Sequence, residues 1–130
     1  MSIASPQLIF KSSMFSVGDG EDASTNPDIY GRALAEWIGR EFVAGFSPDD
    51  IIPEDFGWLV EVPNSQHSLY IACSSTDELA EEWRVMVFAE GGLISRILRK
   101  GNHAESVGET YAAIKRRVEG EDRITDIHEE

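Results

Sequence analysis

Apolar residues recur along this chain with two different periods, and these periods predict strands and helices. Residues 7–16 begin with an apolar run and then alternate loosely, which predicts a first strand. Residues 56–62, 67–74 and 82–89 place an apolar side chain at every second position, which predicts three further strands. Only the turn residues 63–66 separate the first two of these three, so we expect them to form a hairpin.

Two other stretches have the spacing of an amphipathic helix. The first is expected to begin at Asn26, whose side chain can cap free backbone N–H groups, and to continue through Pro27 to Gly45. The second is expected to begin near Asn102 or Ser106 and to end at Gly120. Their predicted buried faces are Tyr30, Leu34, Trp37, Ile38 and Phe42 in the first helix, and Val107, Tyr111, Ile114 and Val118 in the second.

Shorter segments connect these elements. Residues 17–28 are acidic and rich in glycine, which predicts a long loop. Residues 46–55 predict an acidic connector, with one capped helical turn at 47–50. Residues 93–100 predict a short helix, and residues 123–128 a final edge strand.

The order of elements is therefore strand, helix, three strands, two helices and a possible final strand. Consecutive strands at hairpin spacing favour an antiparallel sheet. We expect one α+β domain over residues 1–130, with a sheet of four to five strands and two main helices packed on one face.

The predicted strands are apolar on both faces, which raises the question of what covers the second face. Tyr70, Met86 and Phe88 alternate with the residues that would face the helices. The 93–100 helix, a loop or a partner would have to cover these side chains, and an uncovered face would be a candidate binding surface. Arg84 belongs to the same face, where it would either pair with a loop carboxylate or contact a partner.

The balance of charges disfavours some classes of function. Asp and Glu number 24 against 11 Lys and Arg, which gives a formal net charge of −13. Such a charge argues against binding to nucleic acid or to anionic lipid. Most of the excess lies in loops 19–28, 49–55 and 77–82. These carboxylates are interpreted either as ordinary solvated loop residues or as an acidic surface for a basic partner.

Candidate chemistry is sparse. The lone cysteine, Cys73, lies in an apolar alternating run, so we expect a small buried side chain and no disulfide. The three histidines are far apart, and no phosphate-binding loop or GxSxG sequence is present. We therefore predict no catalytic residues, no metal and no cofactor. The sequence begins without the pattern of a signal peptide and has no membrane-spanning run, so we expect a cytoplasmic protein.

Three motifs carry a resemblance. They are Asn26-Pro27-x-x-Tyr30-Gly31-x-Ala33-Leu34-Ala35-x-Trp37, Pro53-Glu54-Asp55-Phe56-Gly57-Trp58 and Glu82-Trp83-Arg84-Val85. Together with the tail at 124–127 they resemble a group of small acidic bacterial proteins of unassigned function, although that group has Trp where this chain has Phe56. The resemblance implies a bacterial cytoplasmic protein with an α+β fold. In size and charge the chain is also loosely similar to immunity proteins that neutralise toxins.

These observations favour a non-enzymatic protein-binding module, of which an immunity-type inhibitor of a basic protein is one form. The expected partner-binding residues are Tyr30, Asp55, Trp58, Trp83 and Arg84. Their rings would supply buried area and the carboxylate would meet a basic surface. The alternatives are a small ligand-binding domain or enzyme with a pocket beside the 17–28 loop, and a structural homo-oligomer that pairs through the second sheet face.

Overall fold

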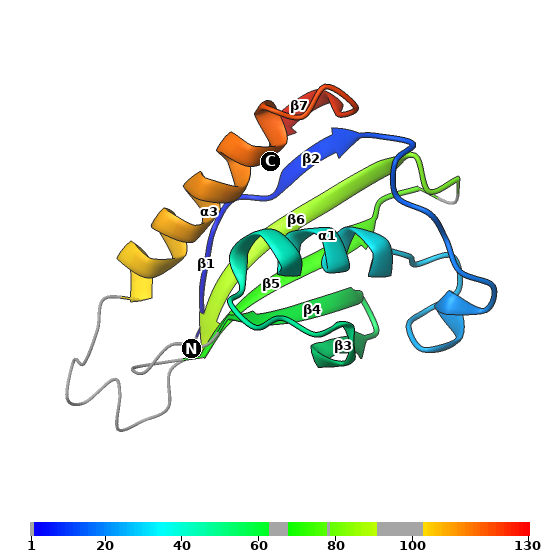
Figure 1. Ribbon diagram of the computed structural model, residues 1–130, viewed down its shortest axis with the longest axis horizontal. Coiled ribbons are helices and arrows are strands. Elements are labelled where there is room, and N and C mark those ends of the chain that lie inside the picture. The colour runs from blue at the N-terminus through cyan, green and yellow to red at the C-terminus, as the bar shows by residue number, and fades with distance from the viewer. Residues whose placement is uncertain (1, 63–67, 78, 91–102) are drawn as a thin grey trace.

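The computed structural model describes residues 2–62, 68–77, 79–90 and 103–130, and it shows an α+β protein built on one antiparallel sheet (Figure 1). The helix expected at 93–100 and the turn at 63–66 lie outside the described residues. The strands are β1 (Ser2–Ala4), β2 (Leu8–Lys11), β3 (Ile51–Glu54), β4 (Gly57–Val62), β5 (Ser68–Ser75), β6 (Glu82–Glu90) and β7 (Thr125–Glu129). The α-helices are α1 (Arg32–Phe42) and α3 (His103–Glu119), and 3₁₀ turns occupy η1 (Glu21–Ala23) and η2 (Pro48–Asp50).

The sheet has more strands than the four to five expected. Six strands follow one another in the order β3-β4-β5-β6-β2-β7, and β1 pairs with β6 beside β2. All of these pairings are antiparallel. The additional strands, β1 and β3, are only three and four residues long, and β3 contains Pro53. Proline is tolerated there because β3 is the edge of the sheet, where a missing N–H leaves no ladder bond unmade.

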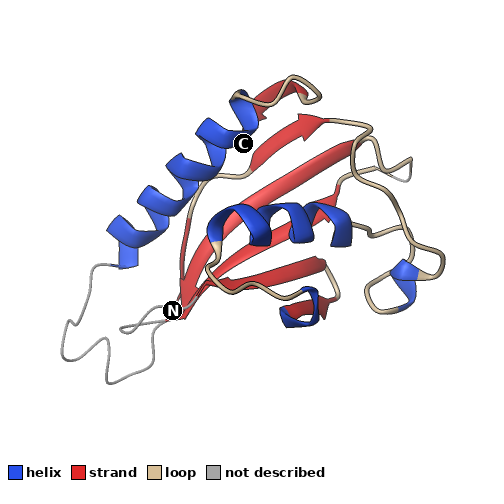
Figure 2. Ribbon diagram, viewed as in Figure 1, coloured by secondary structure: helices blue, strands red, loops and turns tan. Residues whose placement is uncertain are grey.

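Both helices pack on the same face of the sheet, as the sequence predicted. Helix α1 lies across β4 and β5, and α3 lies along β6 and β1 (Figures 1 and 2). One cluster of buried side chains joins the two helices to the inward positions of the strands. It contains the expected stripe residues Leu34, Ile38, Val107, Tyr111, Ile114 and Val118. Among the described residues, no helix has the length and apolar character needed to cross a bilayer.

Helix α1 begins later than predicted. Asn26 and Pro27 lie in a turn instead, and Gly31 occupies the N-cap position. The backbone just before Gly31 is tied to the end of β5, because Tyr30 N–H donates to Ser75 Oγ at 3.0 Å and Ser75 N–H donates to Tyr30 O at 2.7 Å. This tertiary anchoring outweighs the local capping signal at Asn26.

Arg117 connects the two helices. Its guanidinium lies 4.6 Å from the centre of the Trp37 ring and 3.4 Å from Glu41 Oε1, both in α1. It also reaches Glu121 Oε1 at 3.3 Å, just after α3 ends. The basic last turn of α3 is therefore a packing element, as well as a complement to the negative end of the helix dipole.

Glu121 gives the fold a predictable response to acid. The hydrogen bonds that Arg123 donates to its carboxylate, with a further one from Arg117, lower its pKa from 4.5 to about 2. Because the folded pKa is depressed, this group stabilises the fold fully above the unfolded pKa, and the contribution is lost as the pH falls from about 4.5 to about 2. Glu121→Gln should therefore lower the free energy of unfolding at about pH 6. The variant should also lose less of that free energy than the original chain when the pH is lowered.

Urea unfolding at about pH 6 and about pH 3 measures this effect. The neighbouring Asp122→Asn is the matched control, since Asp122 is exposed in the same turn. Equal losses for the two variants at about pH 6 would contradict the assignment to Glu121.

Candidate functional site

The sheet has a second face, opposite the helices, that no described element covers. It is formed by the strand positions that alternate with the core residues, and we call it the open face. It consists of Ile52 and Glu54 of β3, Leu59 and Glu61 of β4, Tyr70, Ala72 and Ser74 of β5, Glu82, Arg84, Met86 and Phe88 of β6, and Ile9 and Lys11 of β2. Four of these side chains are buried, namely Ile9, Leu59, Ala72 and Ser74, and the others are partly or fully exposed. This is the second face that the strand pattern predicted.

The open face is apolar and aromatic at its centre. The rings of Tyr70 and Phe88 stack there, with centroids 5.4 Å apart, and both side chains are partly exposed. Ile52 is 39% exposed and Phe56, in the β3–β4 turn, is 45% exposed. Exposed large apolar side chains gathered on one face are the usual mark of an interaction surface.

Two shallow hollows lie on the open face, one on each side of Phe56. The first, of about 200 Å³, is lined by Gln7, Phe56, Ala72, Ser74, Arg84 and Met86. The second, of about 340 Å³, is lined by Ile52, Glu54, Phe56, Leu59, Tyr70 and Phe88. Apolar side chains and one charged residue line each hollow, a combination that also occurs at protein interfaces.

Charges of both signs lie on the open face. Glu54 and Glu61 lie on β3 and β4, and Arg84 and Lys11 lie on β6 and β2. A further carboxylate, Glu82 of β6, lies opposite Lys11. The Arg84 guanidinium donates to Ser74 Oγ at 3.3 Å and makes a long contact of 3.5 Å with Gln7 Oε1. Within the described part of the chain it forms no ion pair, so the loop carboxylate considered from the sequence is not seen beside it.

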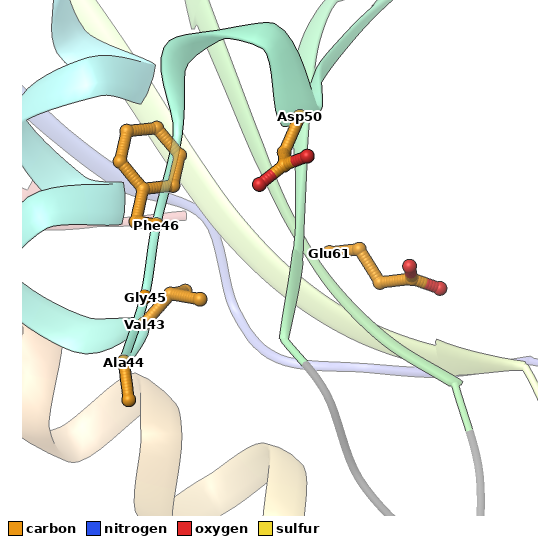
Figure 3. A pocket seen from close by; sticks show the side chains of 6 residues that line it. All are labelled: Val43, Ala44, Gly45, Phe46, Asp50 and Glu61. Atoms are coloured by element: carbon orange, nitrogen blue, oxygen red, sulfur yellow. The ribbon is translucent and has the colours of Figure 1, made fainter.

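A third hollow, of about 300 Å³, lies on another part of the molecule, between the end of α1 and the β3–β4 edge (Figure 3). Residues 43–46, Asp50 and Glu61 line it. Asp50 already accepts a hydrogen bond from Ser47 N–H at 3.2 Å as part of a capping box. Figure 3 shows the Glu61 carboxylate directed away from Asp50, so the two do not form a paired acid–base site.

The acidic loop at 17–28 is held by its own carboxylates. Glu21 Oε2 accepts hydrogen bonds from Gly31 N–H at 2.8 Å and Arg32 N–H at 3.1 Å, which caps the start of α1. Asp22 accepts from Asp28 N–H at 2.9 Å. In the 77–82 loop, Asp77 likewise accepts from Glu81 N–H at 3.0 Å. These three carboxylates are turn-forming groups, which favours the ordinary loop interpretation for them.

Glu21 therefore has a testable structural role. Glu21→Ala is expected to cost about 1 to 2 kcal/mol of folding stability, because a negative cap is lost at the positive end of α1. Asp19→Ala is the control, since Asp19 is exposed in the same loop and its replacement should change stability by less than about 0.5 kcal/mol. Chemical unfolding of both variants measures the difference, and equal values would show that Glu21 does not act as the cap.

The structure does not bring the five expected partner-binding residues onto one surface. Trp83 is fully buried, with its Nε1 donating to Ser12 O at 3.0 Å, and Trp58 is 3% exposed with its ring 5.4 Å from the Arg32 guanidinium. Both tryptophans occupy inward strand positions, so their rings belong to the core. Neither ring is presented to a partner in this structure.

The other three residues lie apart from one another. Tyr30 is on the helix side, where its backbone is tied to β5, and burial together with nearby carboxylates raises the pKa of its hydroxyl. Asp55 is exposed in the β3–β4 turn beside Phe56. Arg84 is on the open face and lines the same hollow as Phe56. Of the five expected residues, only Arg84 and Asp55 are therefore connected in the structure, through Phe56, which is next to Asp55 in the chain and lines the same hollow as Arg84.

Two residues of this surface, Ile52 and Phe56, do not follow from the sequence pattern. Ile52 lies in the segment predicted as a connector, because a four-residue edge strand containing proline gives no alternating pattern. Alternation over 56–62 predicts Phe56 on the same face as Trp58, but Phe56 precedes β4 and lies in the turn. A residue in a turn does not follow the alternation of the strand, so its odd or even position in the sequence does not show which face its side chain lies on.

Two observations bear on metal binding and on nucleophilic chemistry in the described residues. No three side chains of His, Cys, Asp or Glu gather there in a way that would hold a metal ion. The Cys73 thiol is buried, as expected, and burial raises its pKa. A buried, protonated thiol is a poor nucleophile.

Comparison of the chain with protein-family models, with curated proteins and with solved structures found no match. The open face and its residues are consequently the basis for the function proposed below.

Proposed function

We propose that this protein is a non-enzymatic protein-binding module that binds its partner through the open face of the sheet. The observation that carries the proposal is the aromatic centre of that face, where Phe56, Tyr70 and Phe88 are exposed or partly exposed. Rings flanked by Arg84 and by carboxylates have the composition of a protein interface, with an apolar centre and a charged rim.

An immunity-type inhibitor is the form of this function in which the bound surface is basic. The net charge of −13 supports that form, because complementary charge speeds association. A bacterial cytoplasm is the compartment we propose, supported by the motif resemblance and by the single unpaired cysteine.

Photo-crosslinking in cells tests the proposal. A photoreactive phenylalanine analogue at position 88 replaces a ring of the open face, and the same analogue at position 40 serves as the control on the solvent side of α1. We expect protein adducts from position 88 that are absent from position 40. Equal labelling at the two positions, or no adduct at either, would overturn the proposal.

A further inference from the structure

The open face has a pattern that fits a second copy of itself. Resting on the proposed function, we propose that two copies of this chain pair through their open faces, about a two-fold axis that runs parallel to the strands between β4 and β5. Such an axis places β6 of one copy over β3 of the other, and β5 over β4.

The sheet register defines which residues would then face one another. Ile52, Leu59, Ala72 and Met86 lie in one row across the four strands. Glu61, Tyr70 and Phe88 lie in a second row. In a third row, Glu54 is opposite Gly57 on β4 and Ser74 is opposite Arg84 on β6. The faces of two stacked sheets bury such rows against each other.

Rotation about the proposed axis makes these rows self-complementary. Arg84 faces Glu54 of the second copy, and Met86 faces Ile52 of the second copy. Tyr70, whose hydroxyl can donate, faces the carboxylate of Glu61 of the second copy. Symmetry repeats each contact, so two Arg–Glu pairs would lie in the third row, next to the row of apolar side chains.

The two charged side chains of this pairing, Glu54 and Arg84, have no oppositely charged partner among the described residues. Glu54 lies on an exposed position of the edge strand, and the Arg84 guanidinium donates hydrogen bonds to Ser74 and Gln7.

The net charge gives this inference a distinctive salt dependence. Two copies that each carry −13 repel one another at long range, and salt screens that repulsion. Self-association should therefore tighten as salt rises from about 50 mM to about 300 mM, whereas binding to a basic partner should weaken.

Sedimentation equilibrium of the full chain tests directly whether two copies pair. We expect a dimer whose dissociation constant rises about tenfold or more in Glu54→Arg and in Arg84→Glu. The double variant exchanges the two charges and should return to within about threefold of the original value. Glu54→Arg is the sharper case, because it makes each chain less negative and yet is expected to weaken the dimer.

Arg40→Glu is the matched control for Arg84→Glu, since it makes the same charge change on the exposed side of α1 and should leave the dimer almost unchanged. A chain that stays monomeric, a dimer that weakens with salt, or a double variant without recovery would overturn this inference. If the chain is a monomer but position 88 still gives adducts with another protein, only the proposed pairing of two copies is overturned. If position 88 gives no adducts, the proposed function is overturned as well.

Discussion

Trp83→Ala is expected to reduce the free energy of unfolding by about 4 kcal/mol, the largest single effect that we predict. Trp83 is fully buried on β6, and its ring meets the edge of Phe15 at a centroid distance of 5.6 Å. Truncation would remove this contact, leave a cavity in the core and leave the Ser12 carbonyl without its hydrogen-bond donor. Urea unfolding followed by far-ultraviolet circular dichroism measures the loss.

The hydrogen bond of Trp83 can be separated from its packing by comparing two conservative variants. Trp83→Phe removes the donor to Ser12 O, whereas Trp58→Phe removes an Nε1 that is buried and has no hydrogen-bond partner among the described residues. Trp58→Phe should therefore be the less costly of the two, by about 1 to 2 kcal/mol. A nearly neutral Trp83→Ala, or a more costly Trp58→Phe, would show that Trp83 is not the core residue described here.

Gly57→Ala is expected to cost about 3 kcal/mol, because both the conformation and the surroundings of Gly57 require glycine. Its φ is +149°, and a Cβ built there would lie 2.5 Å from the carbonyl oxygen of Cys73 on β5. Backbone atoms cannot give way as a flexible side chain can, so β4 and β5 would have to separate. Thermal unfolding should show the loss as a lower Tm.

Gly108→Ala is the control for this prediction, with the opposite sign. Gly108 lies in α3, and no atom of the described residues lies within 4 Å of the position that its Cβ would take. Alanine there should therefore stabilise the protein by about 0.5 to 1 kcal/mol. A loss of stability in Gly108→Ala equal to that in Gly57→Ala would contradict the close approach of β4 to β5.

The sequence was informative where periodicity is long and uninterrupted. Strands β5 and β6 and the apolar stripe of α3 follow from alternation and from helical spacing. In each of them the two sides of the element face different surroundings over eight or more residues, which imposes a regular period on the sequence. The start of α1 was predicted too early, since its cap is the carboxylate of Glu21, ten residues before Gly31. A cap supplied by a distant loop residue leaves no local signature.

The candidate site was predictable as a face but not as a set of residues. Alternation separated Arg84 from Trp83, and it also indicated that the strands are apolar on both sides. It could not tell which face the helices would cover, and so Trp83 was expected at a partner surface when it lies in the core. A large ring suits either environment, and only the packing of α1 and α3 distinguishes them.

The central claim, that another protein covers the open face, can be tested on the unaltered chain by the oxidation of its methionines. Met86 lies on the open face and Met14 packs against the core on the other side. Hydroxyl-radical labelling of dilute purified protein and of the same protein in a cell extract would compare the two sulfurs by mass spectrometry. We predict that Met86 is protected several-fold in the extract while Met14 reacts equally in both, and an unchanged Met86 would contradict the claim.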